Sequence, residues 1–122
     1  MPQEYILDLI KARVAPADRP WDEGVVADGG STQPFIVERS WSGPSGHYTE
    51  QWSIRQGGST ILFESQPERR FVRGLQSITT YADQVDQPIA LEPGTYQLVF
   101  VVEGRYMGSY AFEVGAKKTA AV

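Results

Sequence analysis

Short β-prone runs separated by turn residues fill most of the chain after Pro34. Apolar and polar side chains alternate within these runs, which is the period of a strand with one buried face. Glycine and proline recur between the runs, and these residues supply the turns that short strands require. The runs are PFIVERSW, HYTEQWSIRQ, STILFES, RRFVRGLQSITTYA, TYQLVFVVE and YMGSYAFEV. The pattern predicts an all-β domain.

The segment before these runs has a less regular pattern. Residues 4–14 fit the spacing of a helix and also that of a strand, and both assignments stay open, with strand preferred. Pro16 ends the segment in either case, because proline disfavours helical backbone in the residue before it. Residues 15–34 read mostly as loop, with a short strand considered at residues 25–27, and we expect Trp21 to anchor that loop to the core.

A first hairpin can be placed in register by arithmetic. A two-residue turn at Gly57 and Gly58 favours a tight hairpin, because glycine adopts the left-handed backbone that such turns need. That turn puts large side chains together on one face, as a core requires. The predicted pairs are Ile54 with Ile61 and Trp52 with Phe63.

A second hairpin follows from the last two runs. A two-residue turn would pair Leu98 with Ser109 or Ala111, whereas a three-residue loop at residues 103–105 keeps large apolar groups together. We therefore predict the three-residue loop and these pairs: Tyr96 with Phe112, Leu98 with Tyr110 and Val102 with Tyr106.

Composition limits the classes of protein that the chain can belong to. Its 122 residues fit one domain, expected to span residues 1–115 and to be followed by a flexible tail at 116–122. With no cysteine, disulfides, thiolate zinc sites and cysteine nucleophiles are excluded. We expect no cofactor and no metal, and the lack of a leader pattern or a long apolar run predicts a cytoplasmic protein without membrane contact.

The charge of the chain argues against nucleic acid as a partner. The formal net charge is −4, whereas phosphate contacts need a concentrated basic surface. The densest basic stretch, ERRFVRG, holds Arg69, Arg70 and Arg73. We interpret these three side chains as a solvated face that prevents edge-to-edge pairing of strands.

One stretch resembles a known family. LEPGTYQLVF is similar to the corner before strand F of immunoglobulin-like β-sandwiches, where a tyrosine hydroxyl bonds to the backbone a few residues upstream. Tyr96 holds the place of that tyrosine, and Trp52 that of the strand C tryptophan. The two cysteine positions of the family fall on Leu98 and near Val37.

This resemblance implies a fold but no function. It covers roughly residues 34–114 and implies an immunoglobulin-like antiparallel β-sandwich of about seven strands without a disulfide. The Pro-Gly-x-Tyr ending is also similar to small single-domain bacterial proteins of unknown function. Because this sandwich hosts many activities, the resemblance brings no site residues with it.

Candidate catalytic groups are few. The single histidine, His47, has serines nearby but no recognisable nucleophile motif around it. An acid-pair hydrolase would need two carboxylates about 5–10 Å apart, and Glu50 with Glu38 is the pair considered. Neither arrangement outweighs an ordinary structural role, so we expect no enzymatic activity.

The last hairpin predicts a binding surface. If Leu98 and Phe100 point inward, apolar side chains also occupy the outer face, where polar residues are expected. The expected interface residues are Leu62, Val99, Val101 and Met107. Such a face can be covered by residues 4–14, by a homodimer or protein partner, or by a small ligand. We therefore expect a non-catalytic binding or assembly module.

The alternative hypothesis is a module that binds carbohydrate or another small ligand. Aromatic side chains in loops can stack on sugar faces, and the loop SWSGPSGHY carries several candidates. The possible ligand contacts are Trp41, His47 and Arg105.

Overall fold

The computed structural model describes residues 7–74 and 76–116, and no helix occurs in these ranges. The all-β prediction is therefore confirmed, although the strands are more numerous than the seven or so expected. Residues 4–6 and 117–122, part of two predicted segments, lie outside the described residues. The ten strands are β1 (Asp8–Pro16), β2 (Val25–Asp28), β3 (Ser31–Thr32), β4 (Phe35–Ser42), β5 (Gly46–Gln56), β6 (Thr60–Glu64), β7 (Glu68–Val72), β8 (Thr79–Val85), β9 (Gly94–Val102) and β10 (Arg105–Ala116).

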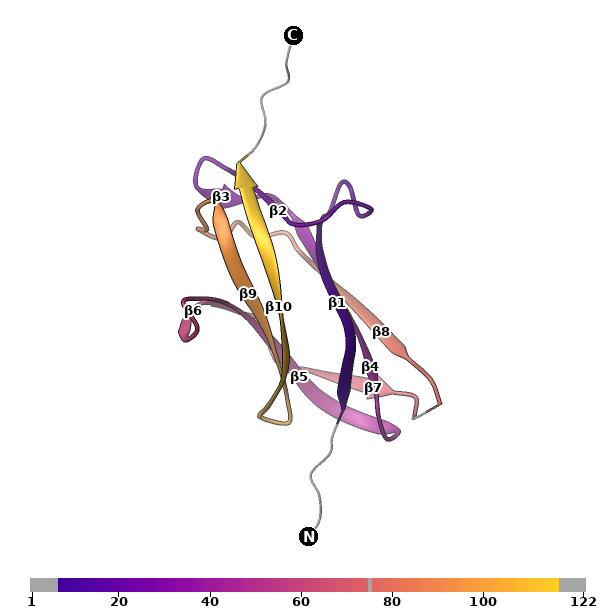
Figure 1. The fold of residues 1–122 in the computed structure, drawn as a ribbon. Coiled ribbons are helices and arrows are strands. Elements are labelled where there is room, and N and C mark those ends of the chain that lie inside the picture. Colours follow the sequence, from indigo (N-terminus) through magenta and orange to yellow (C-terminus); the bar gives the residue numbers. More distant parts are fainter. Residues whose placement is uncertain (1–6, 75, 117–122) are drawn as a thin grey trace.

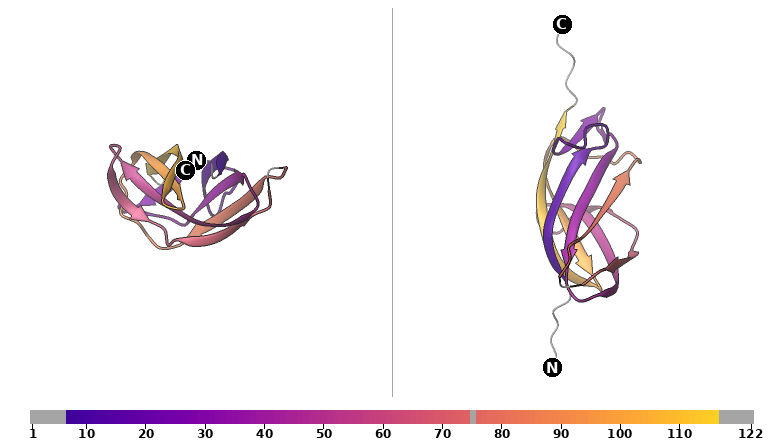
Figure 2. Two further views of the ribbon diagram at one scale, coloured as in Figure 1. Left: turned by 90° about the horizontal axis from the view of Figure 1, so that it is seen from below. Right: turned by 90° about the vertical axis from the view of Figure 1, so that its right-hand side faces the viewer.

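The strands form two sheets around one core (Figure 1). The small sheet has the order β1-β4-β8, and the large sheet has the order β3-β2-β10-β9-β5-β6, with β7 also paired to β5. All pairs are antiparallel except β2 with β10, which is parallel. The large sheet curls into a half-barrel, so that its inner face wraps the core (Figure 2).

The N-terminal segment is a strand within the described residues. β1 pairs with β4 through eight register positions, including Val14 opposite Val37, so the preferred strand assignment is confirmed from Asp8 onward. β1 thus extends the small sheet and does not cover the outer face of the last hairpin. Its Leu9 approaches β10 so closely that a Cβ at Gly108 would lie 2.8 Å from Leu9 Cδ2. A side chain at position 108 would therefore require the Leu9 side chain to shift.

The predicted register of the β5–β6 hairpin is wrong. Ile54 lies opposite Phe63, and Leu62 is an extra residue that the ladder skips. The backbone of Trp52 instead bonds to Ser65, whose N–H donates to the Trp52 carbonyl at 2.8 Å. The bulge moves Ile61 out of the core to an exposed edge position.

The β9–β10 hairpin confirms two predicted pairs and overturns the third. Tyr96 lies opposite Phe112 and Leu98 opposite Tyr110, as predicted. The turn, however, has only two residues, Glu103 and Gly104, with φ of 51° and 77°. Both lie in the left-handed region, which matches the twist of paired strands. The resulting pairs are Arg105 with Val102 and Tyr106 with Val101.

A bulge at Met107 reconciles this short turn with the apolar pairing. The register shifts between Tyr106 and Gly108, so one residue of β10 has no opposite partner. Met107 consequently packs against the core, and its predicted place on the outer face is wrong.

The corner before β9 has the expected hydrogen bond. The Tyr96 hydroxyl donates to the Glu92 carbonyl at 2.6 Å and ties the corner to the strand. Val37 and Leu98 are fully buried, and the side chain of Trp52 is also in the core. Trp21 is the exception: it is 78% exposed, so it does not anchor its loop to the core.

Substituting Tyr96→Phe is expected to lower the free energy of unfolding by about 1 kcal/mol, because the Glu92 carbonyl loses its donor while the buried ring remains. Denaturant unfolding measures the change. Tyr106→Phe is the matched control, since that ring is largely exposed, and its effect should stay within about 0.5 kcal/mol. Equal effects of the two substitutions would contradict a structural role for the corner.

Candidate functional site: a groove above a buried charge network

A buried ion pair joins the two sheets. Arg39 of β4 is 1% exposed and Glu50 of β5 is 3% exposed. The Arg39 Nε–H donates to Glu50 Oε2 at 2.7 Å, and a second guanidinium nitrogen donates to Oε1. The Trp41 indole N–H also donates to Glu50 Oε2, at 2.7 Å. Three of the donors to this carboxylate therefore come from the opposite sheet, and Arg70 of the neighbouring strand β7 supplies a fourth.

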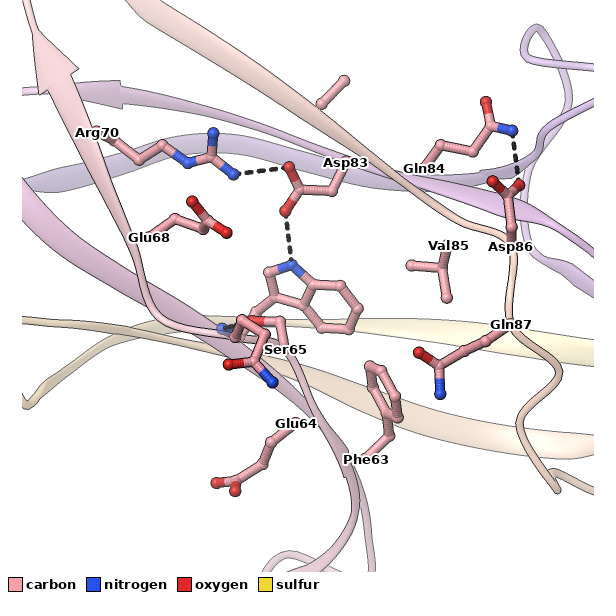
Figure 3. A pocket seen from close by; sticks show the side chains of 13 residues that line it. Phe63, Glu64, Ser65, Glu68, Arg70, Asp83, Gln84, Val85, Asp86 and Gln87 are labelled. Carbon is pink, nitrogen blue, oxygen red and sulfur yellow. Dashed lines mark hydrogen bonds and ion pairs between the residues drawn. The ribbon is translucent and has the colours of Figure 1, made fainter.

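Asp83 of β8 extends the network toward the surface. It accepts a hydrogen bond from the Trp52 indole N–H at 3.0 Å and one from Arg70 at 2.7 Å (Figure 3). Arg39 lies 3.1 Å from the same carboxylate, and Arg70 Nε lies 3.3 Å from Glu50. Each sheet therefore contributes one arginine and one carboxylate: Arg39 and Asp83 from the small sheet, and Glu50 and Arg70 from the large sheet. We call Arg39, Glu50, Arg70 and Asp83 the charge network.

The network keeps Asp83 and Arg39 charged. Burial by itself would raise the pKa of Asp83, but the hydrogen bond from Trp52 and the nearby Arg39 and Arg70 outweigh it, and the pKa falls below its ordinary value. Burial likewise acts to lower the pKa of Arg39, yet Glu50 and Asp83 outweigh burial and raise it. Each charge is therefore stabilised by its partners.

A groove of about 550 Å³ opens above this network, between β8 and the edge formed by β6 and β7. Asp83, Arg70 and Trp52 lie at its base, and Phe63 packs beside Trp52 with ring centroids 5.6 Å apart. The other labelled side chains surround the opening in Figure 3. Around Asp83 and Arg70, the polar lining adds a serine, three acids and three amides, namely Ser65, Glu64, Glu68, Asp86, Gln66, Gln84 and Gln87. We call this the edge groove.

The predicted interface residues do not share one exposed face. Val99 is only 8% exposed and lines a shallow hollow on the outer side of the large sheet with Arg55 and Tyr106. Val101 is half-buried, and Leu62 is exposed on the edge strand β6. Because Met107 packs against the core, less apolar surface is available on this face than the sequence predicted.

The three predicted loop contacts also differ in how exposed they are. Trp41 is buried and donates to Glu50, so its prediction as a ligand contact is wrong. His47 is exposed on β5, with its ring 5.1 Å from that of Phe71. Arg105 is exposed at the start of β10.

The predicted acid pair is not assembled. Glu50 points inward, whereas Glu38 points outward from β4 and forms an ion pair with Arg13 at 3.0 Å. The carboxylates that do come together are Glu50 and Asp83, held by the same two arginines. Sequence reasoning missed Arg39 and Asp83, and it treated Arg70 as a solvated side chain.

No group of three or more histidine, aspartate or glutamate side chains in residues 7–74 and 76–116 could hold a metal ion. Within the same ranges, no helix is long and apolar enough to span a bilayer.

The comparisons with known proteins show a fold and no family. No family model matches the chain, and neither does any curated protein. Part of an alkylpurine DNA glycosylase, AlkC, from Pseudomonas fluorescens, solved bound to DNA containing an abasic site analogue, is similar with a TM-score of 0.50 and 14% identity. That match covers 90% of this chain and 30% of the glycosylase.

A β-glucosidase from Listeria innocua, solved in complex with isofagomine, is similar with a TM-score of 0.53 and 11% identity. The match covers 94% of this chain and 17% of the glucosidase. The chain thus spans less than a third of either enzyme. At these identities the similarity concerns the fold alone.

Replacing Glu50 by Gln is expected to lower the free energy of unfolding by about 3–5 kcal/mol, because it leaves Arg39 buried beside a neutral group. Glu68→Gln, on the exposed rim, is the matched control and should change stability by less than about 0.5 kcal/mol. The double variant Arg39→Met with Glu50→Met removes both charges and should be more stable than Glu50→Gln. Chemical denaturation compares all four proteins, and a neutral Glu50→Gln would contradict the role of the pair.

Stability is also expected to depend on Asp83 in acid. Because the folded-state pKa of Asp83 lies below its ordinary value of 3.8, its contribution is present above that pH and is lost as the pH falls through the folded value. Unfolding free energies measured from neutral to strongly acid pH should fall less steeply for Asp83→Asn than for the unchanged protein. Parallel curves would show that the carboxylate contributes nothing.

Proposed function

We propose that the chain is a non-catalytic binding module with an immunoglobulin-like fold. Three features support the fold: the Tyr96–Glu92 bond at the corner, the buried Trp52, and the apolar Val37 and Leu98 at the cysteine positions. The switch of consecutive strands β4 and β5 between sheets also fits such a sandwich. With a curled large sheet and ten strands among the described residues, the domain is a larger variant of the immunoglobulin-like sandwich.

The state of the buried carboxylates supports a role without catalysis. A general acid or base must reach the substrate and change its protonation during turnover. Glu50 is buried among donors from Arg39 and Trp41. Asp83 is held by Trp52 and Arg70, with its pKa lowered. Both groups are therefore held by contacts within the charge network, which supports a structural role for them.

The edge groove carries the binding proposal. Its volume of about 550 Å³ falls within the range of small-molecule sites, and it combines an apolar wall with several hydrogen-bonding groups. Gln84 and Gln87 offer both donors and acceptors, and Glu64 and Glu68 offer acceptors. The half-buried ring of Phe63 provides an apolar surface beside them.

These groups fit a neutral ligand rich in hydroxyl groups, such as a short oligosaccharide. Hydroxyls donate to carboxylates and amide oxygens and accept from amide N–H groups, while the C–H face of a sugar can lie on an aromatic ring. An anionic ligand fits less well, because Glu64, Glu68 and Asp86 would repel it. The groove thus replaces the loop aromatics as the proposed site.

Assembly through the outer face of the last hairpin is a second candidate function. It is supported by Val101, which is half-buried, and by Leu62, which is exposed beside Ile61 on the edge strand β6. Edge strands with apolar side chains can pair with another chain. Val99 and Met107 add little to such an interface, because they are largely covered.

Titration with a panel of neutral oligosaccharides should therefore change tryptophan fluorescence and give a saturable heat signal in calorimetry, since Trp52 lies at the base of the groove. The double variant Gln84→Ala with Gln87→Ala should weaken binding about tenfold, as two hydrogen bonds are lost. Val101→Asp is the control and should bind normally. Absence of binding across the panel would contradict the groove proposal, and loss of binding in Val101→Asp alone would place the site on the outer face.

A further inference from the structure

The β1–β2 connection presents an exposed tryptophan on a fixed backbone. Trp21 is 78% exposed, although Arg13 donates to the carbonyls of Pro20 and Asp22 on either side of it. The Asp22 N–H also donates to the Arg19 carbonyl at 2.9 Å. Tryptophan is enriched among the residues that dominate binding energy, and a held loop loses little conformational freedom when it binds.

This connection, residues 17–24, is acidic, and we call it the tryptophan loop. Asp18, Asp22 and Glu23 surround Trp21 in sequence, and Arg19 is the loop's single basic residue. Arg19 lies 3.9 Å from Asp18 and 3.5 Å from Asp22, so its charge is used within the loop. A partner surface that accepts Trp21 should therefore be apolar and flanked by cations.

Such a surface exists on the same chain. Residues of β7 alternate, so that Arg70 and Val72 point inward while Arg69 and Phe71 point outward. Phe71 is 42% exposed. Exposed Arg73 follows it and donates to the carbonyl of Ile78, whose own side chain is exposed. We call Arg69, Phe71, Arg73 and Ile78 the arginine strip.

The two surfaces lie at opposite ends of the molecule. Figure 1 shows the β1–β2 connection at one end and the β7–β8 connection at the other. Within one copy the loop therefore cannot reach the strip. The tryptophan loop carries an apolar side chain surrounded by acids, and the arginine strip carries apolar side chains flanked by arginines. The two surfaces are therefore complementary in charge and in apolar character.

We propose that the tryptophan loop of one copy docks on the arginine strip of a second copy. Trp21 packs against Phe71 and Ile78, and the loop acids lie beside Arg69 and Arg73. Because the two surfaces differ, each copy keeps one unused loop and one unused strip, and the contact repeats into open chains. This assembly uses neither the edge groove nor the outer face of the last hairpin.

A single-stranded nucleic acid is the competing occupant of the strip. Arginines beside an exposed aromatic ring can bind phosphates and stack a base. The strip offers the exposed ring of Phe71, flanked by two arginines and with exposed His47 beside it, whereas the chain as a whole has a net charge of −4. The acidic tryptophan loop complements the strip in both charge and apolar character, so the observations favour the second copy.

Sedimentation velocity of the full chain from micromolar to millimolar concentration tests the contact. The weight-average mass should rise with concentration and fall with added salt, since the flanking charges are exposed. Trp21→Ala and, separately, Phe71→Ser should each weaken association at least about tenfold. Tyr106→Ala removes another exposed aromatic side chain and should associate like the unchanged protein.

Mixing the Trp21→Ala and Phe71→Ser variants tests whether the loop of one copy contacts the strip of another. Trp21→Ala retains a working strip and Phe71→Ser retains a working loop, so together they should form a one-to-one dimer that does not grow. Unfolding midpoints of both variants, compared with the unchanged protein, show that each is folded. A monomeric unchanged protein throughout this range, or a mixture that stays monomeric, would overturn the proposal. Binding of a fluorescent single-stranded oligonucleotide to the strip without self-association would assign the strip to nucleic acid instead.

Discussion

The arrangement of the two sheets depends on the buried contact between Arg39 and Glu50. Taking both charges out of water costs several kcal/mol for each ion, so neither residue can stay where it is without the other. Further contacts depend on this pair. Glu50 also accepts a hydrogen bond from the Trp41 indole N–H, and Arg39 also forms an ion pair with Asp83. Strands β4, β5 and β8 must therefore meet in one register. The edge groove lies where this charge network reaches the surface.

Alternation of side chains predicted strands β4, β5 and β9 and their inner faces, because a strand with one buried face repeats every two residues. It missed strand β3 and placed the exposed Ile61 of β6 in the core. It could not predict the bulges at Leu62 and Met107. A bulge inserts one residue, and the pattern on each side of it remains regular, so the shift becomes visible only when both strands are aligned. The same limit explains the wrong turn length at Glu103 and Gly104.

The candidate site was less predictable than the fold, yet part of it has a sequence signal. Val37, Arg39 and Trp41 alternate on one inward face, which places an arginine in the core and requires a carboxylate opposite. Glu50, which points inward from β5, meets that requirement. The contribution of Asp83 could not be anticipated, since it comes from a strand 33 residues further along the chain than Glu50. Trp21 shows the opposite failure, because an apolar side chain is not always a core side chain.

The contacts of the charge network also differ in the loop-closure entropy that each one costs, because they join residues at different separations along the chain. Glu50 is 9 residues from Trp41 and 11 from Arg39, whereas Asp83 is 31 residues from Trp52. The entropy lost in closing a loop grows with its length. The β4–β5 connection therefore joins the sheets at the lowest loop-closure cost within the network. The solvent-side contact of Asp83 with Arg70 spans 13 residues, whereas its contact with Trp52 closes a loop of 31 residues.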